Sequence, residues 1–255
     1  MNPKLELALG TARSLTGFSL PEDILLTWLQ KGGPLSLKRN EVLEKTIRNF
    51  KDDLFLVIRG AVAESFIDST GGHYQLLRST GAILNDPPNW KPSQLGPPLF
   101  EQGGTRAMCP THLWRIPGDW HVTMMQEVPI AQLMYVRRLR DANLLRNFLI
   151  MLSTESSNQR VARFLFTLAS LTGKVQGRSV HIPISQRDLS VLCRLTPKTV
   201  NIVMAAWKSQ GWIRILRGRM EILDMRSLRR ESGLQDRAGF VSYPDWVEKR
   251  VRPKG

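Results

Sequence analysis

The sequence predicts an α+β protein of 255 residues with a strand-rich N-terminal part, one long helix, and a small C-terminal part of helices and a hairpin. Three observations predict this class. Short β-rich runs precede residue 128, an apolar period of three to four residues begins after Pro129, and two short helices and a hairpin fit residues 185–222. We therefore expect four regions, which are 1–128, 129–157, 158–230 and 231–255.

The first region has the pattern of a small β-sandwich or barrel. The β-rich run "LFLVIRGAVAESFI" is broken at Gly60, and Ser69-Thr70-Gly71-Gly72 then separates it from the next such run, as in a hairpin. Residues 81–104 contain five prolines and four glycines, a density that neither a helix interior nor a central strand tolerates. We expect a long loop there, followed by further strands over residues 105–120.

The second region is a helix of more than 20 residues. Its periodic positions recur at helical spacing and are Ile130, Leu133, Val136 or Arg137, Leu144, Leu145, Phe148 and Leu152. We expect the other side to carry Arg137, Arg138, Arg140 and Arg146. An apolar stripe of this length is buried either against its own domain or against a second copy of the chain.

The third region contains two short helices joined by a tight turn. Ser185 is placed to cap the first helix, with Asp188 three residues later as in a capping box. Thr196-Pro197 predicts the second start, because the hydroxyl caps the helix and proline at the first position loses no hydrogen bond. The apolar face of the second helix is predicted to be Val200, Val203, Met204 and Trp207.

Two alternating strands follow, around Arg217-Gly218, and predict a hairpin with Arg217 and Arg219 at its tip. Two helices and a basic hairpin in this order are typical of a winged helix-turn-helix, whose second helix enters the DNA major groove. A cationic hairpin tip beside that helix is suited to phosphate contacts, which position the protein without reading sequence.

The charge distribution favours the same interpretation. Residues 1–136 carry 13 Lys and Arg and 13 Asp and Glu, whereas residues 137–255 carry 23 and 9, so the C-terminal half holds the whole net charge of +14. A domain of this charge is expected to bind a polyanion, most often DNA or RNA. A solvated basic face, or a helical core that serves protein contacts, is the alternative.

These segments together resemble the cyclic-AMP receptor/fumarate-nitrate regulator (CRP/FNR) superfamily of bacterial transcription factors. The resemblance rests on "LVIRGAVAESF", "NQRVARFLFTLA", "ISQRDLSVLCRLTPKTVNIVMAAWKSQGWI" and "RGRMEIL". It implies a cyclic-nucleotide-binding-like β-roll (jelly roll) over 1–128, a dimerisation helix over 129–157 and a winged helix-turn-helix over 158–230. The implied partners are double-stranded DNA and a second copy of the chain, and RNA polymerase is a further candidate.

Matching positions imply roles for individual residues. The DNA-backbone positions are Ser185, Gln186, Thr196 and Thr199, to which the hairpin tip adds Arg217 and Arg219. The base-reading positions are Pro197, Lys198, Asn201 and Ile202. Many members have an Arg-Glu-x-x-x-Arg pattern there, so we expect a different operator, with Lys198 on guanine and Asn201 on adenine. Arg194 stands where the turn usually has glycine, which implies a turn without the left-handed residue or a reshaped one.

The sensor departs further from the pattern. The Gly-Glu-Leu segment of the cyclic-nucleotide binders is missing, and Glu101 falls near the position of their phosphate-binding arginine. A carboxylate there repels a phosphate, so we expect no cyclic AMP binding by the usual mode. The effector, if there is one, stays open, and so does a sensor that leaves the dimer permanently competent for DNA.

No cofactor or metal is expected. The two cysteines, Cys109 and Cys193, are too few for an iron-sulfur cluster or a disulfide framework. Cys109, His112 and His121, at spacings of three and nine, are candidate metal or haem ligands, but this spacing is more often that of surface or hydrogen-bonded histidines. Cys193 is expected to be a buried thiol, and Trp120, Met124 and Met125 are expected in the core.

Two further classes of function are alternatives. An enzyme is disfavoured, since no nucleophile-base pair, carboxylate pair or phosphate-binding glycine loop is found. A non-specific nucleic-acid-binding or protein-interaction module stays open. Because no membrane helix or signal sequence is evident, we expect a cytoplasmic protein. Residues 231–255 form a basic extension that either trails along the DNA backbone or is disordered.

Overall fold

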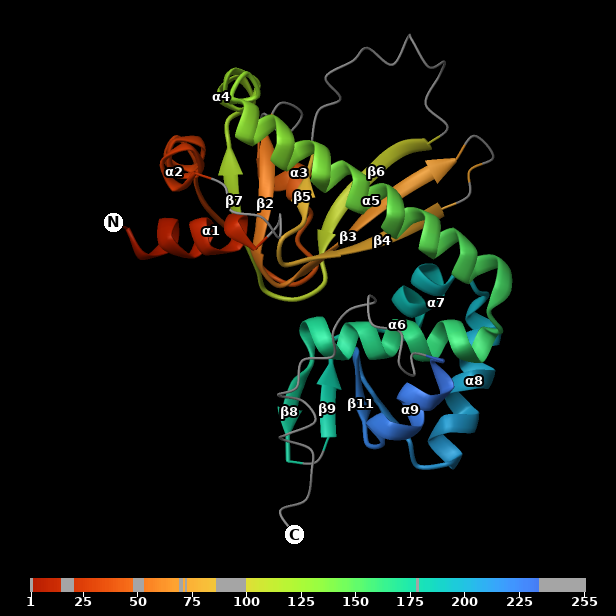
Figure 1. Ribbon diagram of the computed structural model, residues 1–255. Helices are drawn as coiled ribbons and strands as arrows, with labels where there is room; N and C mark the ends of the chain where they lie inside the picture. Colours follow the sequence, from red (N-terminus) through yellow and green to blue (C-terminus); the bar gives the residue numbers. More distant parts are fainter. Residues whose placement is uncertain are drawn as a thin grey trace. The chain divides into compact units, whose positions relative to one another are not determined.

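A computed structural model describes residues 2–14, 21–47, 53–68, 71, 73–85, 100–177 and 179–233 (Figure 1). The side chains of Asp68, Phe100, Glu101 and Gln102 are not among the described features. The chain divides into two compact units, Met1–Asn147 and Phe148–Gly255. Most of the proline-rich stretch and, from residue 234, the basic extension lie outside the described residues.

The N-terminal unit combines short helices with two antiparallel sheets. Its helices are α1 (Pro3–Arg13), α2 (Glu22–Gln30), α3 (Leu43–Thr46) and α4 (Gly118–Met124). Its strands are β1 (Gly33–Leu37), β2 (Leu54–Arg59), β3 (Ala61–Asp68), β4 (His73–Ser79), β5 (Ile83–Leu84), β6 (Phe100–Ala107) and β7 (Thr111–Ile116). The strand orders are β1-β7-β2-β5 and β4-β3-β6.

The predicted hairpin and the break at Gly60 are both found. Strands β3 and β4 pair antiparallel from Ala61↔Ser79 to Ile67↔His73. Gly60 has φ +104, and a Cβ there would lie 2.9 Å from the Pro110 carbonyl oxygen, so the change from β2 to β3 requires glycine. The small β-domain predicted before residue 128 is thereby confirmed as two antiparallel sheets.

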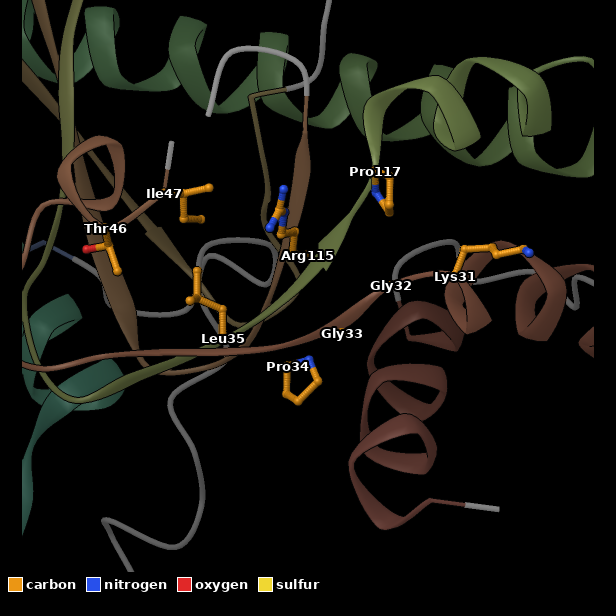
Figure 2. Close-up of a pocket in the computed structure, with 9 residues that line it drawn as sticks. All are labelled: Lys31, Gly32, Gly33, Pro34, Leu35, Thr46, Ile47, Arg115 and Pro117. Carbon is orange, nitrogen blue, oxygen red and sulfur yellow. The ribbon is translucent and has the colours of Figure 1, made fainter. Parts of the chain in front are cut away.

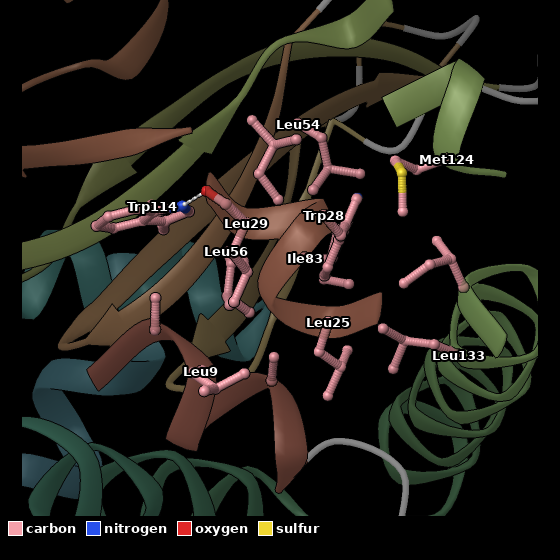
Figure 3. Close-up of a cluster of buried hydrophobic side chains, with 14 of the residues drawn as sticks. Leu9, Leu25, Trp28, Leu29, Leu54, Leu56, Ile83, Trp114, Met124 and Leu133 are labelled. Atoms are coloured by element: carbon pink, nitrogen blue, oxygen red, sulfur yellow. Dashed lines mark hydrogen bonds between the residues drawn. The ribbon is translucent and has the colours of Figure 1, made fainter. Parts of the chain in front are cut away.

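An apolar core holds the helices of this unit on the β1-β7-β2-β5 sheet (Figure 3). Leu25, Trp28 and Leu29 of α2 are fully buried beside Leu54 and Leu56 of β2. The Trp114 indole N–H donates to the Leu29 carbonyl oxygen at 2.9 Å, which fixes the end of α2 against β7. Met124 is in this core as expected, with Trp120 and Met125 partly buried against it.

The long helix α5 is Val128–Thr154, which covers most of the predicted range 129–157. Ile130, Leu133 and Met134 are fully buried in the core of the N-terminal unit. Leu144 and Leu145 are exposed, so these two positions of the stripe are not buried against their own domain, and burial against a second copy stays a prediction. Arg137 is only 8% exposed, so its expected place on the polar side was wrong. Arg137 pairs with Asp141 on the same helix, and that carboxylate also binds Arg78 of β4, as described below.

The C-terminal unit contains α6 (Ser157–Thr172), α7 (Gln186–Cys193), α8 (Pro197–Ser209) and α9 (Met225–Glu231). Its strands are β8 (Lys174–Gln176), β9 (Ser179–Ile182), β10 (Ile213–Leu216) and β11 (Arg219–Ile222), in the order β10-β11-β9-β8. Helix α6 begins with a capping box between Ser156 and Gln159 and buries Val161, Leu165 and Leu168. It is the apolar centre on which α7, α8 and α9 pack.

Within the described residues, none of the helices combines the length and the apolarity that crossing a membrane requires.

Candidate nucleic-acid interface

Helix α7 begins where the Ser185 cap predicts. The Ser185 hydroxyl oxygen accepts from the Asp188 backbone N–H at 3.1 Å, and its O–H donates to the Asp188 carboxylate at 2.7 Å. Leu189 and Leu192 are fully buried beneath the helix. Cys193 is a buried thiol, as expected, and burial raises its pKa, so it stays protonated.

The turn after α7 keeps the left-handed geometry, but with an arginine. Arg194 has φ 51 and ψ 49, and its N–H bonds to the carbonyl oxygens of Ser190 and Val191. The sequence-based expectation of a turn without a left-handed residue was therefore wrong. The hydrogen-bonded helix end demands that geometry, although a residue with a Cβ adopts it at a cost of about 1 kcal/mol.

Helix α8 begins at Thr196-Pro197 as predicted, with the Thr196 hydroxyl accepting from the Thr199 N–H at 3.1 Å. The predicted apolar face is confirmed, because Val200, Val203, Met204 and Trp207 are all buried. The opposite face is open to solvent. Its exposed residues are Pro197, Lys198, Asn201, Ile202, Ala205, Ala206, Lys208 and Ser209.

A stacked tryptophan pair joins α8 to the hairpin that follows. The rings of Trp207 and Trp212 lie 5.9 Å apart at 26°, and the Trp212 N–H donates to the Trp207 carbonyl oxygen at 2.9 Å. The Trp212 carbonyl oxygen in turn accepts from the N–H groups of Leu223 and Asp224. One residue therefore ties the end of α8 to both ends of the hairpin, a role that the sequence-based prediction missed.

The predicted hairpin is formed by β10 and β11, with Leu216 opposite Arg219 and a two-residue turn at Arg217-Gly218. Gly218 has φ 70, and the side chains of Arg217 and Arg219 are exposed. Strand β9 pairs with β11 and holds this wing on the body of the unit. The wing therefore presents two cations on a fixed support.

The predicted contact residues gather at the two helix starts and the hairpin tip. The four predicted base-reading residues are all exposed on α8, and Arg217 and Arg219 are exposed on the wing. Ser185, Gln186 and Thr199 are half-buried, and Thr196 is exposed at the start of α8. The hydroxyls of Thr196 and Thr199 lie 2.9 Å apart. This arrangement is suited to binding phosphates at the helix starts and the hairpin tip, and to contacting base edges from the exposed face of α8.

The acidic residues of this domain serve structural bonds. Residues 158–230 contain 14 Lys and Arg but only three carboxylates. Asp188 bonds to the cap of α7, Asp224 caps α9, and Glu221 accepts from Ser179 at 2.7 Å and from Arg214 at 2.9 Å. The Ser179 hydrogen bond is the main cause that lowers the pKa of Glu221. The surface around the helix-turn-helix is therefore strongly positive.

An ion network occupies the N-terminal unit where β3 and β4 approach α5. Arg78 of β4 donates from Nε to Glu64 of β3 at 2.5 Å and from Nη1 to Asp141 of α5 at 2.7 Å. Arg137 donates to the same Asp141 oxygen at 2.8 Å. Glu64 and Arg137 are 5% and 8% exposed. The four-residue spacing of Arg137 and Asp141 on a helix could have predicted their ion pair from the sequence. Nothing in the sequence indicated that Arg78 joins the network.

Burial dominates the protonation behaviour of this network. It raises the pKa of Glu64 despite Arg78, and it lowers the pKa of Arg137 despite Asp141. Two arginines and two carboxylates balance each other in charge. The network therefore attaches α5 to the β4-β3-β6 sheet as a neutral group of four charges.

Figure 2 shows an open pocket of about 610 Å³ elsewhere in this unit, at the turn between α2 and β1. Lys31, Gly33 and Arg115 contribute to its lining. Arg115 is paired with Asp53 at 2.5 Å, and the Lys31 ammonium lies 5.8 Å from the centre of the Trp120 ring. Both cations of the lining thus already have partners within the chain.

The three sequence-derived metal candidates have separate surroundings. The Cys109 sulfur lies 4.0 Å from the Thr111 hydroxyl, His112 Nδ1 lies 2.9 Å from the Ser36 hydroxyl, and His121 Nδ1 accepts from the Trp28 indole at 3.3 Å. Among the described residues, no three His, Cys, Asp or Glu side chains are grouped to hold a metal ion. Packing and hydrogen bonding account for all three.

Comparison with known proteins identifies the helix-turn-helix part of the chain. Residues 159–231 match the family model described as a Crp-like helix-turn-helix domain. No curated protein matches this sequence. Among solved structures, a CRP-family transcriptional regulator of Thermus thermophilus is 17% identical, with 78% of this chain and 96% of that chain covered and a TM-score of 0.61.

Two further structures agree. FixK2 of Bradyrhizobium japonicum is 16% identical, with 78% of this chain and 96% of that chain covered and a TM-score of 0.59. CLP of Xanthomonas campestris, described as a c-di-GMP responsive global regulator, is 12% identical, with 80% and 100% covered and a TM-score of 0.60. At these identities the structures show a shared fold, and the family model identifies the DNA-binding domain within it.

Proposed function

From the fold and the Crp-like helix-turn-helix domain of the CRP/FNR superfamily, we propose that this chain is a sequence-specific transcriptional regulator. It acts as a homodimer on a roughly palindromic operator, without catalysis and without cyclic AMP bound in the usual mode. The observation that carries the proposal is the solvent-exposed face of α8, where Lys198 and Asn201 stand beside a wing with Arg217 and Arg219 at its tip.

Recognition divides between base-reading and phosphate-binding residues. The Lys198 ammonium is suited to the guanine O6 and N7 acceptors, and the Asn201 amide to the adenine N6 and N7 edge. Arg217 and Arg219 are suited to phosphates, which give affinity and register but no sequence preference. A positive surface of this kind also raises the rate at which the protein finds DNA.

An exposed apolar face on α5 supports a homodimer. Val128, Tyr135, Leu139, Leu145, Leu149 and Ile150 are 43–65% exposed. At ~100° per residue these side chains fall within a sector of about 140° on the helix. A long apolar face that stays in water marks an interaction surface, and two identical helices related by a two-fold axis cover each other's face. Such a dimer presents two α8 helices to two half-sites.

The dimer proposal has a matched pair of variants. Leu149 and Leu144 are 53% and 51% exposed, but Leu144 lies on the opposite side of α5 from the apolar face. Leu149→Lys is expected to weaken dimerisation at least tenfold in sedimentation equilibrium, whereas Leu144→Lys leaves it unchanged. Equal effects of the two variants would contradict a dimer through this face.

The ion network supports independence from cyclic AMP. Arg78 of β4 and Arg137 of α5 are both at most one-sixth exposed, and both are already paired with carboxylates. Arg78 binds Glu64 and Asp141, and Arg137 binds Asp141. A cyclic phosphate would have to displace a carboxylate from one of them. The Glu101 side chain, the sequence argument for the same conclusion, lies outside the described features. Calorimetric titration with cyclic AMP tests this independence, and a dissociation constant in the micromolar range or lower would contradict it.

The decisive experiment is a selection of bound duplexes from a random pool at near-physiological salt, with no small molecule added. We expect enrichment of an inverted repeat with half-sites roughly one helical turn, or about 34 Å, apart. Binding to all duplexes alike, with a steep salt dependence, would instead indicate the alternative of a non-specific nucleic-acid-binding module.

Point variants then separate the two kinds of contact. Asn201→Ala is expected to cost about 1–3 kcal/mol on the operator and to relax preference at one base pair. Arg217→Ala should weaken binding to every duplex and reduce the salt slope by about 1. Arg13→Ala, a charge removed from α1 of the other unit, is the control and should change neither. Identical profiles for the Asn201 and Arg217 variants would contradict the assignment of helix and wing.

A further inference from the structure

The exposed face of α8 has an apolar centre. Ile202 is 63% exposed, and among the residues that the structure describes between 157 and 233 it is the one large apolar side chain with such exposure. Lys198 lies one turn before it and Ala206 one turn after it on the same face. The Ile202 side chain therefore projects between Lys198 and Ala206, next to Asn201.

Neither the fold nor the helix requires isoleucine at this position. The core face of α8 is complete with Val200, Val203, Met204 and Trp207, all buried. A β-branched side chain also has lower helix propensity than alanine or lysine. Burying an isoleucine side chain is worth ~1.5–3 kcal/mol, and α8 alone leaves most of this unrealised.

The surroundings of Ile202 restrict what covers it. A protein partner would need a wider apolar patch, whereas Ile202 is surrounded by exposed Lys198, Asn201 and Ala205. In the floor of the major groove one apolar group stands among polar base edges, the C5 methyl of thymine. The side chains of Ala205 and Ala206 are short, so they do not obstruct the approach of Ile202 to the floor of the major groove.

We infer that Ile202 is a specificity-determining residue that selects a thymine, by packing on its methyl group, next to the base pair read by Asn201. This inference rests on the proposed function and deepens it, because it states part of the operator. With Lys198 suited to guanine and Asn201 to adenine, each half-site then contains a guanine, an adenine and a thymine within the few base pairs that one helix turn covers.

The test removes one methyl group from the DNA. Each thymine in one half-site of the selected operator is replaced in turn by deoxyuridine, which lacks only the C5 methyl, and affinities are measured with the intact protein. At one position, the replacement of thymine by deoxyuridine is expected to weaken wild-type binding about fourfold, which is the effect of one buried methyl group. At that position Ile202→Ala should bind the thymine and uracil operators equally. The control Leu7→Ala removes an apolar side chain that is 56% exposed on α1, and it should discriminate as the wild type does.

The outcomes separate the two proposals. If wild type binds its operator specifically but no uracil position matters, or if Ile202→Ala still discriminates, the inference is overturned and the regulator remains. If wild type binds all duplexes alike, the proposed function and the inference fail together. Because Ile202 is exposed, the alanine variant is expected to fold, and unchanged thermal unfolding checks this.

Discussion

The two units of the chain use their charged residues in different ways. In the N-terminal unit Glu64, Arg78, Arg137 and Asp141 form a balanced group that holds α5 on a sheet. In residues 158–230 of the C-terminal unit, the three carboxylates are used in caps and in the Glu221 cluster, so the basic side chains dominate the surface there. One unit thus uses charge to fix its own parts, and the other presents charge to a partner.

The largest expected effect comes from breaking the balanced group. Arg78→Met keeps the length of the side chain but leaves Glu64 and Asp141 with only Arg137. An uncompensated buried charge costs about 3–5 kcal/mol, so the N-terminal unit should unfold at clearly lower urea concentration. Tryptophan fluorescence and hydrogen exchange at β3 and β4 measure this.

The control for that variant is a surface pair. Arg13 pairs with Glu22, and both side chains are about half exposed. Arg13→Met should therefore cost less than about 1 kcal/mol. If Arg78→Met were no more harmful than Arg13→Met, the network would have no part in holding α5.

A smaller effect is expected in the turn of the C-terminal unit. Arg194→Gly relieves the left-handed backbone and should stabilise this unit by up to about 1 kcal/mol, less the extra freedom of glycine in the unfolded chain. Arg187→Gly, at an exposed position within α7, should destabilise by a similar amount. Urea unfolding measures both variants, and a loss of stability in Arg194→Gly would mean that the arginine side chain outweighs the backbone strain.

The smallest effect is a contrast in pH dependence between Glu64 and Glu221. The raised pKa of Glu64 makes its contribution to stability greatest below its ordinary value of 4.5 and lost as pH rises through the folded value. The lowered pKa of Glu221 gives stability that is complete above 4.5 and lost as pH falls through the folded value.

The variants Glu64→Gln and Glu221→Gln test that contrast. Between wild type and Glu64→Gln, the difference in free energy of unfolding should shift against wild type as pH rises above 4.5. Between wild type and Glu221→Gln, it should shift in favour of wild type as pH rises towards 4.5 and then level off. Urea titrations from pH 3 to 7 measure both, and slopes of the same sign would contradict the difference between the units.

Local signals predicted the helix-turn-helix well. Thr196-Pro197 places the start of α8, and the 200/203/204/207 spacing gives its buried face, because both depend on neighbours within one helix. The burial of Arg137 was not predictable in the same way, since its partner Asp141 is shared with Arg78, which is 59 residues from Arg137 in the chain. Arg194 shows the same limit, because helix termination selects the left-handed geometry over the preference of the residue.

The stacked pair Trp207 and Trp212 also gives the protein an optical label. Two indoles 5.9 Å apart at 26° are close enough for their strong far-ultraviolet transitions to couple, so they are expected to contribute a distinct far-ultraviolet circular dichroism signal. Because one ring belongs to α8 and the other precedes β10, this signal reports whether α8 and the wing keep their mutual orientation. The orientation can therefore be compared between the protein and its variants without an added dye.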